Sequence, residues 1–360
     1  MTHSVAISNS SSGQAPQKET TPTVLLTGGT GLVGSHLLLE LVRRKRSVLA
    51  LKRPGSNTEQ VERTWSHYGD PEQVKEWLLQ VHWVDADLLD ENNLRAHLKN
   101  IRTVVHAAAM VSFLPGKRNE MIRFNTESTR LLVNLCLEKK VEAFAHVSSV
   151  STLGIPLFNR PADESLIGAP DKSKSGYALS KFFAENEVWR GIAEGLPAVI
   201  VNPSVVLGPG DWNRSSGRFF QAMWNGLTCY PEGGTGFVDV RDVARIVVDL
   251  ADRKCFAERF ILSAGECSYR ELFEMIAKAL GKDAPRRKVS SGILEILWRL
   301  EAIRSFLTGS EPRVTRETAA ISRRFSRFSS EKIRNLMGDS FRPLEETIQD
   351  TARFFLKEKS

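Results

Sequence analysis

Val24-Leu25-Leu26-Thr27-Gly28-Gly29-Thr30-Gly31-Leu32-Val33-Gly34 decides the fold of this 360-residue chain. The apolar run 24–26 predicts a buried parallel strand, and the spaced glycines predict a tight turn into a helix. Gly28 and Gly31 allow a pyrophosphate to approach the backbone closely, and Gly34 lets the helix pack on the strand. Free N–H groups at the helix start then face the phosphate, around Thr30, Leu32 and Val33. We therefore interpret the stretch as a nucleotide-binding turn, the alternative being a plain turn.

The end of the second strand indicates which dinucleotide is bound. Residues 47–51 predict this strand, and Lys52 and Arg53 follow where an NAD-selective site places an acidic residue for the ribose 2′-hydroxyl. Their positive charge suits a 2′-phosphate. A solvated basic strand end is the alternative. The sequence therefore predicts NADP(H) in preference to NAD(H).

Two further strand ends complete the predicted cofactor site. Residues 81–84 predict a third strand, after which Asp87 can accept from the adenine amino group and Leu88 can cover the ring. A helix N-cap is the alternative role for Asp87. A fourth strand at 103–105 runs into small residues that leave room for a flat ligand at the edge where open α/β sheets bind ligands, namely Ala107, Ala108 and Ala109.

Tyr177 and Lys181 are the candidate proton-transfer pair. They are four residues apart and therefore share one face of the helix predicted to open at Gly176. A free tyrosine has a pKa of about 10, and a nearby ammonium lowers it toward neutrality. Lys181 can also donate to the nicotinamide ribose, and Ser149 can hydrogen-bond the substrate oxygen. Such pairs are common on exposed helices. Here the pair follows the glycine turn, the alanine-rich strand end and the serine strand end in one regular alternation of strands and helices, which favours a functional role.

In this order of motifs, the chain resembles an extended short-chain dehydrogenase/reductase, in the branch similar to dihydroflavonol reductases and 3β-hydroxysteroid dehydrogenases. The resemblance covers about residues 23–344. It implies that Gly28, Gly31 and Gly34 form the family's glycine motif. It also implies a catalytic set made of Ser149 (with Ser148 as the fallback), Tyr177, Lys181 and Asn125, which supports the active site.

The same resemblance extends to two later segments. Residues 202–210 correspond to the segment after strand six that closes over the nicotinamide, which adds Pro203, Ser204 and Val206 to the cofactor set. Asn202 stands where most relatives carry Arg or Tyr. Residues 238–244 match the family's Val-Asp-Val-Arg-Asp-Val-Ala element.

The predicted fold class is α/β, a doubly wound parallel Rossmann sheet with a smaller C-terminal substrate-binding domain. Residues 1–22 predict a disordered tail. Residues 23–206 predict the NADP-binding domain, which 238–262 rejoin, and 207–237 with 263–345 predict the substrate domain. An amphipathic helix is expected at 268–280. The apolar helix expected at 293–307 is interpreted as a packed face, although contact with substrate, a partner chain or a membrane surface stays open.

Composition excludes several classes of function. The net charge of +7 comes from scattered basic clusters without a recognition motif, so no nucleic-acid partner is expected. Arg323 to Arg327 is the one cluster that is also suited to an anionic substrate group. The four cysteines and seven histidines show no metal-ligand spacing, which predicts no metal and a reducing cytoplasm. We also expect neither a signal peptide nor a transmembrane segment.

Reduction of a ketone or aldehyde by NADPH, or the reverse alcohol oxidation, is the favoured function, with Tyr177 as proton donor. Met110, Val111 and Phe113 suggest an apolar pocket wall and hence an apolar or cyclic small-molecule substrate. A nucleotide-sugar epimerase with the same triad and a non-catalytic NADP-binding sensor are the alternatives. By analogy with the family, the helices after strands four and five are compatible with a homodimer seam.

Overall fold

The computed structural model describes residues 21–112, 114, 116–154, 156, 160–171, 174–289, 292, 296, 298–301, 304–305, 319, 322–339 and 341–359. Residues 1–20 of the predicted tail, Phe113 of the predicted pocket wall and much of the predicted 293–307 helix lie outside the described residues. In the described part of that last segment, Ile296 is 59% exposed and Leu300 is 57% exposed.

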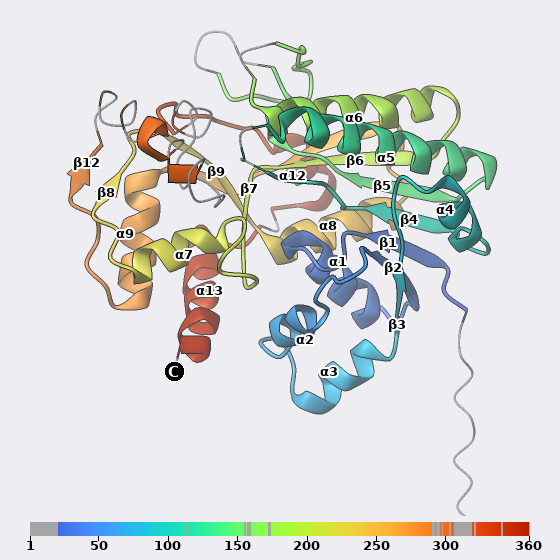
Figure 1. Cartoon of the computed structure of the whole chain (residues 1–360), viewed down its shortest axis with the longest axis horizontal. Helices are drawn as coiled ribbons and strands as arrows, with labels where there is room; N and C mark the ends of the chain where they lie inside the picture. The colour runs from blue at the N-terminus through green and yellow to red at the C-terminus, as the bar shows by residue number, and fades with distance from the viewer. Residues whose placement is uncertain are drawn as a thin grey trace, which may run out of the picture.

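A parallel sheet forms the centre of the molecule, with the strand order β10-β6-β5-β4-β1-β2-β3 (Figure 1). Its strands are β1 (Val24–Thr27), β2 (Val48–Lys52), β3 (Val81–Asp85), β4 (Thr103–His106), β5 (Ala143–Val147), β6 (Ala198–Pro203) and β10 (Glu258–Leu262). The order reverses between β1 and β4, which is the switch point where such sheets bind ligands. The predicted doubly wound parallel sheet is therefore confirmed.

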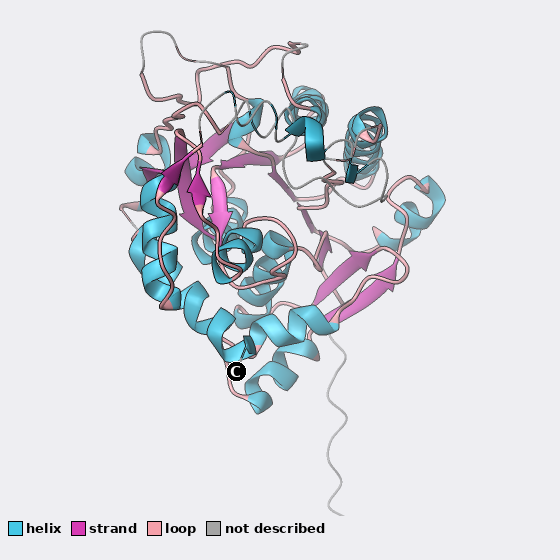
Figure 2. Cartoon of the chain, turned by 60° about the vertical axis from the view of Figure 1, so that its left-hand side comes forward, coloured by secondary structure: helices cyan, strands magenta, loops and turns pink. Residues whose placement is uncertain are grey.

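Helices cover both faces of this sheet (Figures 1 and 2). On one face α1 packs against α8, and on the other α5 packs against α6. The strands are buried on both sides, because alternate residues enter opposite cores: in β5, Phe144 joins one and Ala145 the other. The helices are α1 (Leu32–Arg43), α2 (Glu59–Trp65), α3 (Pro71–Leu78), α4 (Glu91–His97), α5 (Arg118–Glu138), α6 (Gly176–Ala193) and α8 (Val240–Asp252).

A second set of elements lies at the left of Figure 1. Its strands are β7 (Val205–Leu207), β9 (Gly234–Asp239) and β11 (Gly265–Ser268) in one sheet, and β8 (Cys229–Tyr230) with β12 (Arg287–Lys288) in another. Its helices are α7 (Gly217–Trp224), α9 (Tyr269–Leu280) and α13 (Leu344–Lys359), and α12 (Glu331–Met337) packs against β10. A separate core unites α7, α9 and α13 around Trp212, Phe237 and Phe355.

The helix expected at 268–280 is present as α9, and its start is well capped. The Ser268 side chain accepts from the Glu271 backbone N–H, and the Glu271 carboxylate accepts from the Ser268 backbone N–H. This reciprocal pair satisfies two N–H groups that the first turn leaves without a backbone partner.

Helix α13 was not predicted, and polar contacts attach it to the family element at 238–244. Asp239 caps α8 by accepting from the Arg241 backbone N–H at 2.7 Å. The Arg241 guanidinium also pairs with Asp239 and, at 3.0 Å, with Asp350 of α13. The Thr347 hydroxyl donates to Asp239 at 2.9 Å. This element therefore joins the sheet region to the C-terminal helix.

Within the described residues, none of the helices combines the length and the apolar character needed to cross a membrane.

Candidate active site

The glycine turn joins β1 to α1, and its three motif glycines differ in how much room a side chain would have. Gly28 has φ +79°, and a Cβ there would lie 2.7 Å from the backbone N of Ala108. A Cβ on Gly34 would lie 1.9 Å from the Gly28 carbonyl O. A Cβ on Gly31 would lie at an ordinary 3.4 Å from that oxygen. Gly28 and Gly34 are therefore required by the backbone itself, whereas Gly31 leaves free space.

That free space lies at the start of α1. Gly31 is the N-cap and provides no side-chain acceptor for the N–H groups of the first turn, which include those of Leu32 and Val33. Such N–H groups, together with the positive end of the helix dipole, bind phosphate readily. The residues present therefore fit the pyrophosphate of a dinucleotide.

At the end of β2, the two predicted basic residues have different environments. The Lys52 ammonium forms an ion pair with Asp85 at the end of the neighbouring strand β3. The Arg53 side chain is exposed and makes no hydrogen bond or ion pair within the part of the chain that the structure describes. Arg53 is therefore the better placed of the two to receive a 2′-phosphate.

The two residues predicted to contact adenine after β3 lie in different environments. Asp87 is exposed and accepts from the Leu89 backbone N–H at 2.9 Å. The N-cap of α4 is Asp90, so the alternative role of Asp87 as the cap is wrong. Leu88 is 7% exposed and belongs to the core under α4 and α5, which leaves little of its side chain for the adenine ring.

A chain of hydrogen bonds around His106 holds the end of β4 in place. Thr129 donates to the Asn125 carbonyl O at 2.7 Å, so its hydroxyl oxygen accepts from His106 Nε2 at 3.0 Å. His106 Nδ1 then accepts from the Thr27 hydroxyl at 2.7 Å. The Thr27 oxygen in turn accepts from the Ala108 backbone N–H at 3.2 Å. The alanine turn, the glycine-turn strand and α5 are thus linked through one neutral imidazole.

This buried imidazole predicts a loss of stability in acid. Burial lowers the pKa of His106 to about 3, whereas an unfolded histidine titrates near 6.5. The unfolded chain therefore binds a proton at His106 that the native state does not bind. The free energy of unfolding falls as the pH drops below about 6.5. Between pH 6.5 and 4.5 we expect His106 to contribute a loss of about 2–3 kcal/mol.

Denaturant unfolding at both pH values tests this expectation. His106→Gln should reduce the pH dependence of the unfolding free energy by that amount, and the partly exposed His97→Gln serves as the control. An unchanged pH dependence in His106→Gln would show that His106 titrates alike in both states.

Asn125, on α5, holds two segments of the site together. Its side-chain oxygen accepts from the Met110 backbone N–H at 2.7 Å, and its amide donates to the Met110 carbonyl O at 3.0 Å. The amide also donates to Ser180 at 3.0 Å, and Ser180 donates to the Tyr177 carbonyl O at 2.8 Å. Asn125 therefore acts on Tyr177 through Ser180, which makes it a positioning residue.

Ser149, Tyr177 and Lys181 come together at the carboxyl end of β5. Burial raises the pKa of Tyr177, and the nearby Ser149 side chain opposes this rise. Lys181 is 4% exposed and donates to the Val147 carbonyl O at 2.7 Å. Burial lowers the pKa of Lys181 to about 8, against the opposing effect of Glu185.

Ser148, the fallback serine, is turned away from this group. It is 4% exposed and donates to the Glu185 carboxylate at 2.5 Å. Ser149 is therefore the serine available to a substrate. Glu185 is not among the residues predicted from the sequence, although it lies one helical turn beyond Lys181, a spacing that places both on one face of α6.

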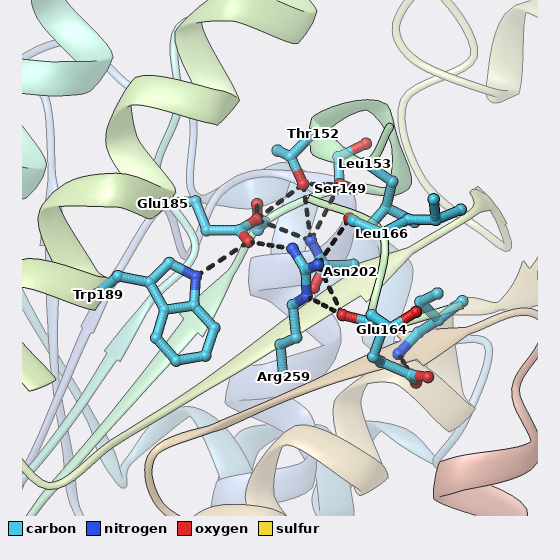
Figure 3. A network of polar contacts seen from close by, with 12 residues as sticks. Ser149, Thr152, Leu153, Glu164, Leu166, Glu185, Trp189, Asn202 and Arg259 are labelled. Carbon is cyan, nitrogen blue, oxygen red and sulfur yellow. Dashed lines mark hydrogen bonds and ion pairs between the residues drawn. The ribbon is translucent and has the colours of Figure 1, made fainter. Parts of the chain in front are cut away.

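The segment predicted to follow strand six begins two residues later than expected, because β6 continues to Pro203. Asn202 and Pro203 are the last residues of β6, and Val206 lies in β7. The Asn202 amide donates to the Ser149 carbonyl O at 3.1 Å and to Glu185 at 2.8 Å (Figure 3). This position thus supports the serine segment, and Ser204 is 7% exposed between the two strands.

The described residues contain no cluster of three or more His, Cys, Asp or Glu side chains that could hold a metal ion. All four cysteines are free thiols.

Comparison with known proteins places the chain among relatives of the same architecture. Residues 24–258 match the model of the NAD dependent epimerase/dehydratase family. The "Sterol demethylase protein B" of Methylococcus capsulatus is 26% identical over 76% of this chain and 79% of that protein. The "Putative dihydroflavonol 4-reductase" of Synechocystis is 26% identical over 92% of this chain and 93% of that protein.

A solved structure also matches over nearly the whole chain. The crystal structure of gox2253 has a TM-score of 0.76 and 30% identity, over 94% of this chain and 99% of that one. On the family match, which covers more than half of its residues, this chain belongs to the NAD dependent epimerase/dehydratase family.

Proposed function

We propose that this protein is an NADPH-dependent carbonyl reductase of the extended short-chain dehydrogenase/reductase type. The observation that carries the proposal is the approach of the Ser149 side chain to the Tyr177 phenol beside the buried Lys181. This group lies at the carboxyl edge of the parallel sheet, where the glycine turn also lies. The same residues can reduce a carbonyl or oxidise the corresponding alcohol.

The dinucleotide would be held along this edge of the sheet. The first turn of α1 would bind the pyrophosphate through Leu32 and Val33, and Arg53 would bind the 2′-phosphate. When bound, the cofactor supplies the hydride that reduces the carbonyl carbon. Lys181 would donate to the nicotinamide ribose, as the resemblance to the family implies.

Side chains of the protein supply the proton and stabilise the negative charge that develops on the substrate oxygen. Ser149 donates a hydrogen bond to the substrate oxygen, which stabilises the charge that builds there. Tyr177 gives its phenolic proton to this oxygen, and the product is the alcohol. With a pKa of about 8, Lys181 is mainly an ammonium at neutral pH, and its charge stabilises the phenolate that remains.

Two exposed apolar residues support an apolar substrate. Val111, next to the Met110 segment that Asn125 holds, is 54% exposed. Ile167 is 84% exposed, and its carbonyl O would lie 2.9 Å from a Cβ on Gly154, just after the serine segment. Large exposed apolar side chains near a site favour apolar ligands. The names of the sterol and dihydroflavonol relatives point the same way, toward a polycyclic carbonyl compound.

Arg53→Asp tests the cofactor assignment. Removing a charged hydrogen-bond donor costs about 1.5–3 kcal/mol, and the new carboxylate repels the 2′-phosphate, so NADPH affinity should fall at least about tenfold. NADH affinity should be unchanged or improved. Fluorescence titration of both cofactors measures this.

Lys52→Met is the matched control for that titration, because Lys52 is already paired with Asp85. It should change NADPH affinity much less than Arg53→Asp. Equal NADPH affinity in Arg53→Asp and the unaltered protein would show that Arg53 does not bind the 2′-phosphate.

A further inference from the structure

We propose that Glu185 is a positioning residue for this reaction: its buried carboxylate fixes the segment that carries Ser149 and holds the positive charge on Lys181. The inference rests on the proposed function, and it concerns how the site is kept ready rather than which groups touch the substrate. Glu185 is 3% exposed, so its carboxylate acts inside the protein.

One carboxylate oxygen holds both sides of the serine segment. Glu185 Oε2 accepts from the Ser148 hydroxyl at 2.5 Å and from the Thr152 hydroxyl at 2.9 Å (Figure 3). Ser148 and Thr152 flank Ser149 in the chain, so the segment is attached on either side of it. The Asn202 amide donates to the same oxygen at 2.8 Å and to the Ser149 carbonyl O at 3.1 Å. The position of the Ser149 backbone therefore depends on this one oxygen.

The other carboxylate oxygen of Glu185, Oε1, forms an ion pair with the buried Arg259. Arg259 of β10 lies 3.2 Å from Glu185 Oε1, and Trp189 donates to the same atom at 3.3 Å. Arg259 also donates to the carbonyl groups of Glu164, at 2.9 and 2.7 Å, and of Leu166, at 2.7 Å. A cation and several hydrogen-bond donors compensate for the burial of a carboxylate. Arg259 thus pairs with Glu185 and connects it to the loop beside Ile167.

Lys181 lies one turn before Glu185 on α6, in an environment that otherwise disfavours its charge. His106 of β4 and His146 of β5 face it, and burial beside Lys181 lowers the pKa of both imidazoles, which stay neutral. Tyr177 is on the same helix. The Lys174 ammonium faces Glu185 from the loop before α6. Glu185 therefore supplies the negative charge that opposes the loss of the Lys181 proton.

Glu185→Gln tests the inference, because the amide keeps the size of the side chain and removes its charge. A unit charge one helical turn away shifts the pKa of Lys181 by about one to two pH units. The alkaline limb of the pH–rate profile for reduction should therefore shift to lower pH by that amount. The kcat at pH 7.5 should fall at least about tenfold, and NADPH affinity should change little. A uniform fall in kcat with the limb unmoved would overturn the electrostatic role.

Glu187→Gln is the matched control on the same helix, since Glu187 pairs with Arg190 away from the site. It should retain the kcat and pH profile of the unaltered protein. Should Glu185→Gln fail to fold, Ser148→Ala removes one of the donors to Oε2 and keeps the charge. It should lower kcat several-fold with the alkaline limb in place, and an unchanged kcat would overturn the role in holding the serine segment.

A readout without turnover separates failure of this inference from failure of the proposed function. Carbon-13 labelling of the lysine side chains lets the Lys181 ammonium be titrated by NMR, with its signal assigned from Lys181→Met. Loss of the Glu185 charge should lower the Lys181 pKa, about 8 in the unaltered protein, by about one to two pH units in Glu185→Gln and leave it in place in Glu187→Gln. An unaltered protein that reduces no carbonyl would defeat the proposed function alone, whereas an unmoved Lys181 pKa would defeat this inference.

Discussion

Tyr177→Phe is expected to abolish carbonyl reduction and to leave NADPH binding intact. The substitution keeps the aromatic ring and removes the phenolic hydroxyl, which is the group that Ser149 approaches. General acid catalysis contributes about 10²–10⁴-fold, so kcat should fall by about 10³-fold or more. The fall is measured as NADPH oxidation with the best carbonyl substrate, and binding by fluorescence titration.

Tyr230→Phe provides the control, because Tyr230 lies in β8 of the second set of elements. It should retain full activity. Comparable turnover in Tyr177→Phe and the unaltered protein would show that another group delivers the proton.

The second large effect is expected from Gly34→Ala. The added Cβ would lie 1.9 Å from the Gly28 carbonyl O, and this backbone atom cannot move aside without opening the turn between β1 and α1. We expect a loss of at least about 3 kcal/mol in the free energy of unfolding, together with loss of NADPH binding. Denaturant unfolding and cofactor titration measure the two effects.

Gly31→Ala separates the roles of the motif's glycines. A Cβ at Gly31 meets the Gly28 carbonyl O at an ordinary 3.4 Å, so the fold should be as stable as in the unaltered protein. The methyl group would occupy the space assigned to the pyrophosphate, so NADPH affinity should fall about tenfold or more. If Gly34→Ala were as stable as Gly31→Ala, the close approach to Gly28 would not be a structural requirement.

Much of the sheet could be predicted from the sequence, because strands buried on both faces appear as short continuous apolar runs. Val24–Thr27 and Val48–Lys52 contain such runs, and the strands predicted at 24–26 and 47–51 agree with them to within a residue at each end. Helix α13 could not be predicted in the same way. Its position depends on Arg241 and Asp239, which lie more than a hundred residues earlier in the chain.

The site was predictable where a motif fixes neighbours along one helix or turn, as for Tyr177 and Lys181. It was not predictable where the environment depends on another strand. Lys52 and Arg53 look equivalent in the sequence, and Asp85 on β3 distinguishes them. Glu185 looks like an ordinary helical glutamate until Arg259 of β10 pairs with it.

Isotope transfer tests the central claim most directly. NADPH carrying deuterium at the transferable position of the nicotinamide is incubated with the protein and a panel of apolar cyclic ketones and aldehydes, with Tyr177→Phe as the blank. We expect NADPH to be consumed and an equal amount of alcohol to form with deuterium on its carbinol carbon, and we expect neither change in the blank. Conversion of a nucleotide sugar without net consumption of reduced cofactor, and with every carbonyl left intact, would contradict it and establish the epimerase alternative.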